Sequence, residues 1–291
     1  MITRVTNQTM LHGAQRSLQA NLARLADLQE KASSQKAIAR PSDDPAAAAE
    51  ALRVRAEMSA TTQYGRNISN GEGWLTQLEN AMTTSKRALD RVNDLTLQGS
   101  NSSLPPAARE ALALEVESLR SELTTQANAT YAGRFLFAGN ADTAAALAPD
   151  LTFATGGTVG RRVGPHETVR VDADGAAVFG SGSASAFALL DGIAADLRAG
   201  KDVSVHLAPL QQRIQDLTAH HSEIGTRHAR LLEAKDAVAD ASLALEGERA
   251  AVEDVDLASI ILDLRLQETA YQGALAVSAR VLQPSLMDFL R

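Results

Sequence analysis

Residues 252–289 have the sequence VEDVDLASIILDLRLQETAYQGALAVSARVLQPSLMDF, in which apolar residues recur three, four or seven positions apart. The members of this series are Leu257, Ile261, Leu264, Tyr271, Leu275, Leu282 and Phe289. Such spacing predicts a helix with one narrow apolar stripe, flanked by charged residues. A stripe this narrow is typical of a coiled-coil seam, so the helix needs a partner helix to cover it.

A second stripe of the same kind lies at the other end of the chain. In residues 6–33, Leu11, Leu18 and Leu25 fall seven apart, and Leu22 belongs to the second seam position. Two uncovered seams pair most simply with each other, or with copies from other subunits. The entropic cost of closing so long a loop grows only slowly with its length. The sequence therefore predicts that the two chain ends form a coiled coil.

Long helices are also predicted between the two ends. Heptads run through residues 46–98 and 203–245, and shorter helices are expected after Pro105-Pro106 and over residues 184–198. The glycines at 71 and 73 should each weaken the first helix by about 1 kcal/mol relative to alanine. The heptad keeps its phase across them, so residues 46–98 are predicted to form one helix.

Two segments favour strands rather than helices. Residues 131–139 alternate aromatic and small side chains between glycines, which is typical of a short strand or hairpin arm. Residues 149–182 are rich in Gly, Thr and Val, and short alternating runs occur at 151–154, 168–171 and 176–179. We expect this segment to form a small β-rich insert.

Between the first two helices the chain reads Arg40-Pro41-Ser42-Asp43-Asp44-Pro45. Each proline disfavours the helical conformation at the residue before it. Asp44 as N-cap with Pro45 at the first helical position is a favourable helix start. On the residues alone, this motif turn is a break followed by a capped helix.

The composition excludes several classes of function. The 291 residues carry a net charge of −7 with no Lys/Arg block, which disfavours nucleic-acid binding. Cysteine is absent, which removes disulfides, thiolate nucleophiles and cysteine-ligated zinc. Residues 1–8 contain no apolar run, so no secretory signal peptide is visible. No segment is apolar enough over about 20 residues to predict insertion into a membrane.

No catalytic, cofactor or metal site is predicted. His221 and His228 lie two helical turns (~10 Å) apart, too far to share one zinc ion. The adjacent carboxylates of Asp43 and Asp44 stand at a helix start, where acids more often stabilise the helix dipole than act in catalysis. No nucleophile with a base and an orienting group can be assembled, so the chain is not expected to be an enzyme.

Taken together, the two ends resemble the bacterial flagellin superfamily, and within it the flagellar hook-associated protein 3 family. The resemblance rests on Ser33 through Pro45, on residues 131–139, on Val252-Glu253-Asp254-Val255-Asp256-Leu257-Ala258 and on Leu286-Met287-Asp288-Phe289-Leu290. The prolines of the motif turn are usual in junction proteins and unusual in filament flagellins. Gln35 stands where such proteins commonly have glycine, so a glycine-based tight turn is not predicted here.

The resemblance implies a structural component of the bacterial flagellum that forms the junction layer between hook and filament. The implied fold is mainly α: an elongated, flagellin-like antiparallel helical bundle and coiled coil built from both chain ends, with a small β-rich inserted domain. The implied domains are residues 1–40 with 247–291 (terminal coiled coil), 41–140 with 184–246 (helical middle domain) and 141–183 (outer insert). The residues expected to mediate subunit assembly are those of the two seams, with Leu286 and Phe289: Leu11, Leu18, Leu22, Leu25, Leu257, Ile261, Leu264, Tyr271, Leu275, Leu282, Leu286 and Phe289.

The resemblance also implies the partners and the location. The expected partners are further copies in a ring, hook-associated protein 1 on the hook side, flagellin on the filament side and a cytoplasmic export chaperone. The protein is expected outside the cell, after flagellar type III export without a cleaved signal peptide. Three alternatives remain open: a filament-forming flagellin, a membrane-active type III secretion translocator, and an enzyme with its site in the β insert.

Overall fold

The computed structural model describes residues 2–282, which group into two compact units. The terminal unit combines Met1–Ser59 with Ser242–Arg291, and the central unit is Ala60–Ala241. Seven α-helices are present in the described chain: α1 (Ile2–Ser34), α2 (Pro45–Gly99), α3 (Pro106–Ala127), α4 (Gly175–Phe179), α5 (Ala186–Ala199), α6 (Leu207–Glu253) and α7 (Leu257–Leu282). Short 3-10 helices η1 (Gly182–Ala184) and η2 (Ser204–His206) flank α5.

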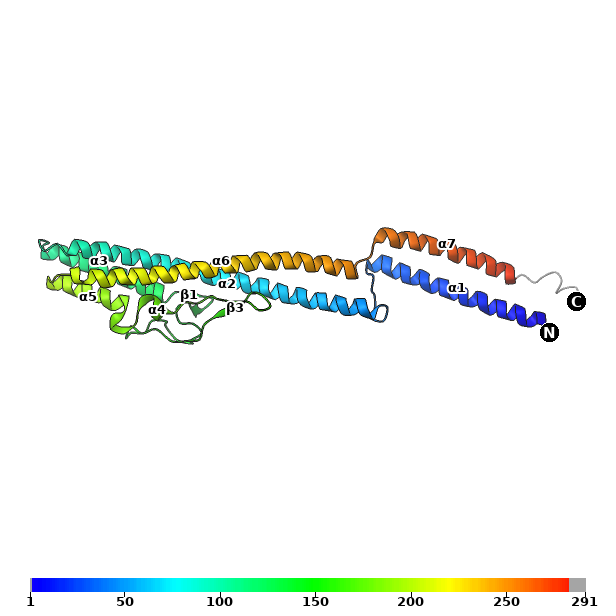
Figure 1. Ribbon diagram of the computed structural model, residues 1–291, viewed down its shortest axis with the longest axis horizontal. Coiled ribbons are helices and arrows are strands. Elements are labelled where there is room, and N and C mark those ends of the chain that lie inside the picture. The colour runs from blue at the N-terminus through cyan, green and yellow to red at the C-terminus, as the bar shows by residue number, and fades with distance from the viewer. Residues whose placement is uncertain (1, 283–291) are drawn as a thin grey trace. The chain divides into compact units, whose positions relative to one another are not determined.

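Two small antiparallel sheets complete the described chain (Figure 1). Strands β1 (Thr130–Tyr131) and β2 (Arg134–Phe135) form a hairpin, and β3 (Gly160–Arg162) pairs with β4 (Thr168–Arg170) in the register Arg161–Val169. The predicted architecture, mainly α with a small β part, is confirmed. The long helices were also predicted, and α2 is continuous through its two glycines. Two bounds differ: α6 runs on to Glu253, and the helix expected from residue 252 begins only at Leu257.

The heptad positions of α2 and α6 form the core of the central unit. Ile68, Leu75, Met82 and Leu89 from α2 are buried together with Leu210, Leu217, Ile224 and Leu231 from α6. An ion pair between Lys235 and Glu72 (3.0 Å) and a hydrogen bond between His228 and Glu79 (2.9 Å) join the same two helices. The sequence period therefore identified the faces of α2 and α6 that pack into the core.

Gly73 shows why α2 carries glycine at that point. A Cβ atom there would collide with the Tyr131 hydroxyl, and the Tyr131 ring packs edge-on against Trp74 at 5.8 Å between centroids. Glycine is the residue that lets the β1–β2 hairpin approach the helix this closely. Gly73 therefore lowers the helix propensity of α2 but makes room for the Tyr131 side chain.

One predicted strand is wrong: residues 176–179 lie in helix α4. The carboxylate of Asp174 accepts hydrogen bonds from the backbone N–H groups of Ala176 (2.9 Å) and Ala177 (3.4 Å), which caps a short helix. Gly180 ends it with a φ of 77°. The side-chain cap from Asp174 satisfies two backbone donors of the first turn and so favours a helix over the strand.

The β-rich segment shares its core with the helices. Phe179 packs against Phe137, Phe153 and Phe187 of α5, and Phe153 also packs against Phe187, with ring centroids 5.1–6.4 Å apart. The segment predicted as an insert therefore belongs to the compact central unit. The three-domain division, with its boundaries at residues 40, 140, 183 and 246, stays a prediction.

Candidate assembly surface and motif turn

Helices α1 and α7 pack side by side and antiparallel within the terminal unit (Figure 1). Partly buried positions recur three or four residues apart on each helix, at residues 14, 18, 21, 25 and 28 of α1 and at 260, 264, 267, 271 and 274 of α7. The Gln267 amide donates to the Asn21 backbone carbonyl (3.2 Å) and to its side-chain oxygen (3.3 Å). The two chain ends thus pair within a single copy, which is one of the two pairings that the stripes left open.

Only some of the residues predicted for assembly lie on this inner face. Leu18, Leu25, Leu264 and Tyr271 are partly buried. Four others are exposed in the single chain: Leu22, Leu257, Ile261 and Leu275. The side chains of Leu11 and Leu282, and the whole of Leu286 and Phe289, lie outside the described residues. The role of all these residues in subunit assembly stays a prediction.

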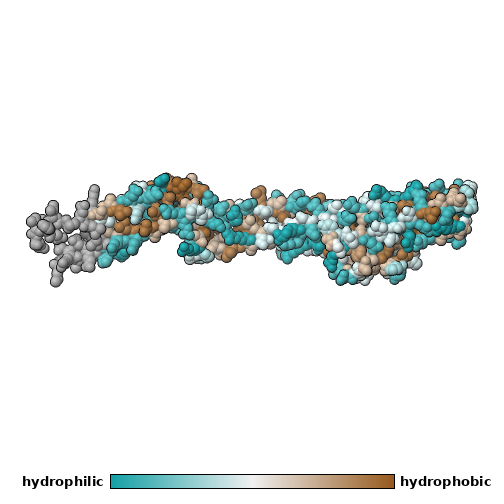
Figure 2. Space-filling view, turned by 180° about the vertical axis from the view of Figure 1, so that it is seen from behind, coloured by the Kyte–Doolittle hydropathy of each residue, from teal (hydrophilic) through white to brown (hydrophobic). Residues whose placement is uncertain are grey.

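Helix α7 carries a second apolar face that one-stripe reasoning missed. Leu262, Leu266 and Val277 are 61%, 62% and 63% exposed, and their spacing sets them on the side away from the inner face. We call these three residues the outer stripe. Figure 2 shows hydrophobic side chains on the surface of the terminal pair. The four-residue spacing of Leu262 and Leu266 was the sequence signal for this face.

The motif turn folds as a capped helix start. The Asp43 carboxylate accepts a hydrogen bond from the Arg40 backbone N–H (2.8 Å), and the Asp43 N–H donates to the Arg40 carbonyl (3.0 Å). Asp44 accepts from the N–H groups of Ala46 and Ala47, both at 3.0 Å, and Pro45 is the first residue of α2. The predicted N-cap is confirmed; Pro41 and Ser42 are exposed in the turn.

The end of α1 is joined to the turn between α6 and α7. The Ala37 N–H donates to the Glu253 carbonyl (2.7 Å) and the Val255 N–H donates to the Gln35 carbonyl (3.3 Å). Gln35 adopts a φ of 57°, in the left-handed region. The tight turn therefore forms here without the glycine that the resemblance led us to expect for such a turn.

Replacing Gln35 with glycine is expected to stabilise this turn. The left-handed conformation costs a residue with a Cβ roughly 1–2 kcal/mol, and the freedom of glycine in the unfolded chain offsets part of that gain. We expect Gln35→Gly to slow amide hydrogen exchange at Val255 and Ala37. Ser34→Gly, at the last helical residue, is the control and should speed exchange; faster exchange in Gln35→Gly would contradict the strain at this residue.

The carboxylate of Glu253 is held by Arg55 of α2. The Arg55 Nε donates to Glu253 Oε1 (2.6 Å) and its Nη2 donates to Oε2 (2.8 Å), while the Glu253 side chain is only 6% exposed. These hydrogen bonds and the charge of Arg55 lower the pKa of Glu253 below its ordinary value. The bidentate pair ties the last turn of α6 to α2.

This pair predicts a pH dependence of the joint. Because the folded pKa of Glu253 is lowered, its stabilisation is fully present above the ordinary pKa of about 4.3 and is lost as the pH falls through the folded value. At pH 6, the Ala37 amide should be better protected from hydrogen exchange in the wild type than in Glu253→Gln. This difference in protection should shrink below pH ~4. A constant difference across this range would argue against a role for the charge.

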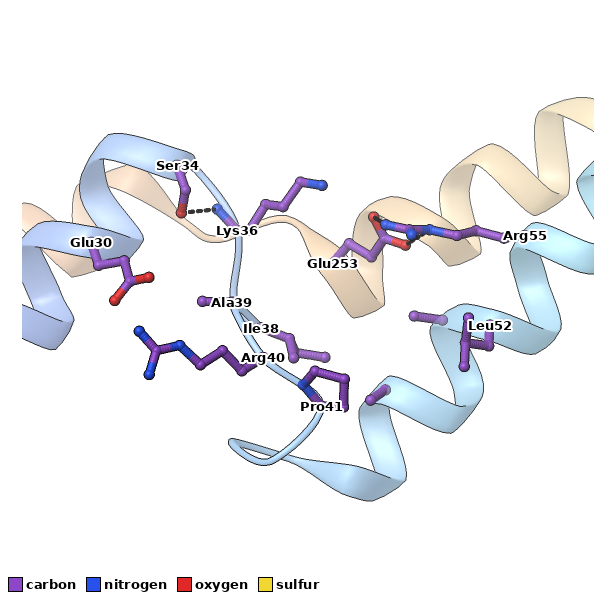
Figure 3. A pocket seen from close by; sticks show the side chains of 12 residues that line it. Glu30, Ser34, Lys36, Ile38, Ala39, Arg40, Pro41, Leu52, Arg55 and Glu253 are labelled. Carbon is purple, nitrogen blue, oxygen red and sulfur yellow. Dashed lines mark hydrogen bonds and ion pairs between the residues drawn. The ribbon is translucent and has the colours of Figure 1, made fainter.

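A hollow of about 450 Å³ lies beside the motif turn (Figure 3). We call it the motif hollow; its lining includes Ile38, Arg40, Pro41, Ala51, Leu52 and Arg55. Leu52 is 65% exposed. The lining acids are Glu30 and Glu253, and Glu253 is paired with Arg55. No described acid forms an ion pair with the Arg40 guanidinium.

Metal-ligand clusters and membrane-spanning helices are both absent from the part of the chain that the structure describes. His228 lies 2.9 Å from Glu79 and His220 lies 3.6 Å from Glu223, and no group of three or more potential metal ligands occurs in that part. None of its helices is long and apolar enough to cross a bilayer.

Known proteins are similar to this chain in sequence. Residues 5–142 match the bacterial flagellin N-terminal helical region. The chain is 24% identical to flagellar hook-associated protein 3 of Salmonella typhimurium, over 93% of this chain and 94% of that protein. It is 23% identical to the flagellar filament 30.7 kDa core protein of Treponema maltophilum, over 86% of each.

Solved structures agree on the fold. A protein from Vibrio parahaemolyticus assigned as a flagellar hook-associated protein superposes with a TM-score of 0.67. The match covers 73% of this chain and all of that one, at 23% identity. At this identity the likeness establishes the fold, and it agrees with a helical bundle that carries a small β part.

Proposed function

We propose that this chain, a structural component of the bacterial flagellum similar to flagellar hook-associated protein 3, forms the junction layer between hook and filament through its terminal helices. The observation that carries the proposal is the similarity to that junction protein along nearly the whole of both chains. The resemblance predicted from the sequence is thereby confirmed. The exposed apolar residues of α7 support the route of assembly, since covering them with a neighbouring copy removes them from water.

Burying one leucine stabilises the assembly by roughly 1.5–3 kcal/mol. Several such residues together can therefore offset the conformational entropy that is lost when a helix pair becomes ordered. The protein acts without catalysis, and copies of it form a ring. Hook-associated protein 1 lies on the hook side of the ring and flagellin on the filament side. An export chaperone holds the C-terminal segment before type III export, which takes the chain outside the cell.

A filament-forming flagellin is the second candidate. It is favoured by the similarity to the Treponema filament core protein over 86% of both chains. The Pro41 and Pro45 positions in the motif turn favour the junction protein instead. A secretion translocator has less support, because no described helix could span a bilayer.

Deletion of the gene separates these functions. Electron microscopy of the deletion strain, combined with an assay of flagellin in the medium, should show bare hooks and flagellin shed from the cells, and both effects should be reversed by the wild-type gene. Cells with neither filament nor shed flagellin would favour a filament flagellin. Intact filaments would contradict both candidates.

A further inference from the structure

Two surfaces of the terminal unit are left uncovered within one copy. The lining of the motif hollow includes the apolar side chains of Ile38, Pro41 and Leu52, and the Arg40 guanidinium extends toward Glu30 at one side of the hollow (Figure 3). Its volume of about 450 Å³ lies in the range of protein pockets that bury a ligand, roughly 300–1,000 Å³. A fitting occupant is therefore apolar with one negative charge beside it.

The outer stripe of α7 has this chemistry. Leu262 and Leu266 lie one helical turn apart and are both more than 60% exposed. Asp263 is exposed next to them and forms no ion pair with any described residue. Two leucines and a free carboxylate on one helical turn complement an apolar hollow that contains a free guanidinium.

A single copy cannot join these two surfaces to each other. The inner face of α7 packs against α1, which leaves the outer stripe on the far side of the helix. The exposure of Leu262 and Leu266 shows that no described residue of the terminal unit covers them. A second copy of the chain, by contrast, brings its own outer stripe and is present in any layer that the protein forms.

We propose that the motif hollow of one copy receives Leu262 and Leu266 of a second copy, and that Asp263 of the second copy pairs with Arg40 of the first. This inference rests on the proposed function, because it names the subunit contact of the junction layer. The contact joins two different surfaces, so it is head-to-tail. Repeated from copy to copy, such a contact closes into a ring or continues as a helix, which suits a layer at the end of a tube.

Disulfide crosslinking tests the contact directly, since the chain has no cysteine. Leu52→Cys and Leu262→Cys variants are expressed in the same cell, and isolated hooks are mildly oxidised. We expect a crosslinked dimer when both variants are present and none with either variant alone. Leu97→Cys, exposed in the central unit, replaces Leu262→Cys as the control and should give no dimer. No dimer from the first pair in assembled hooks would overturn the contact.

Charge reversal tests the ion pair. Arg40→Glu and Asp263→Arg, each alone, should lower the number of filaments per cell at least about tenfold, because like charges then meet in a buried contact. The double variant should restore filaments, since every contact again joins opposite charges. Normal filaments in both single variants would overturn the pair.

The lining acid Glu30 provides a competing explanation within one copy. If Arg40 acts through Glu30, then Glu30→Gln should reproduce the defect of Arg40→Glu, and Asp263→Arg should not rescue it; that pattern would overturn the proposal. A failure of the proposed function is recognised separately, because the deletion strain itself would then keep its filaments. Both reversed residues are exposed, so the purified variants should melt like the wild type.

Discussion

Leu275→Asp is expected to leave the chain folded and exported but to lower the number of filaments per cell at least about tenfold. Leu275 is 45% exposed in the single chain, so a charge there is solvated until a neighbouring copy covers it. In the assembled layer the same carboxylate would be desolvated without a partner, at a cost of several kcal/mol, and each 1.4 kcal/mol is tenfold in binding.

The measurement is electron microscopy of cells in which the variant replaces the wild type, together with flagellin shed into the medium. Gln272→Asp introduces the same charge at a polar, exposed position of α7 and should assemble normally. Unaltered filaments on Leu275→Asp cells would exclude this residue from the assembly interface, while a chain that fails to be exported would point to a defect before assembly.

Phe179→Ala is expected to destabilise the central unit by about 3–5 kcal/mol, the usual range for removing a buried phenylalanine. The Phe179 ring is fully buried and lies 5.1–5.8 Å from the rings of Phe137, Phe153 and Phe187. Its loss would leave a cavity between helix α4, helix α5 and the β-rich segment. The other three rings cannot fill that cavity without leaving their own contacts.

Denaturant unfolding of the purified chain measures this effect through the fluorescence of Trp74. This is the only tryptophan of the chain, and it is buried in the central unit. The unfolding midpoint should fall strongly for Phe179→Ala and hardly change for Val205→Ala, whose side chain is 65% exposed. A loss below about 1 kcal/mol in Phe179→Ala would mean that the cluster is not part of the cooperative core.

Much of the helical fold could be predicted because its signals are local. The heptads of α2 and α6 identified buried residues such as Leu75 and Leu217, and the Asp44–Pro45 pair marked the start of α2. The strand expected at residues 176–179 was wrong because the cap from Asp174 overrode an alternating pattern only four residues long. The resemblance to a junction protein could likewise be recognised from short motifs.

The candidate site was predicted only in part. The sequence indicated that both chain ends carry apolar stripes, and α1 and α7 do pair. It did not distinguish the inner face, with Leu264 and Tyr271, from the exposed Leu275 or from the outer stripe of Leu262 and Leu266. The stripes of α7 overlap in sequence, and which of them α1 covers depends on the rotation of one helix against the other.

By itself, the sequence determined the helical periods, the helix starts and the absence of cysteine chemistry, because each depends on residues close together in the chain or on composition. The tertiary structure alone decided the rest. It placed Arg55 against Glu253, gathered four phenylalanines from separate segments into one core, and held Gln35 in a left-handed turn. These features depend on contacts between residues far apart in the chain, and the geometry of such contacts exists only once the chain has folded.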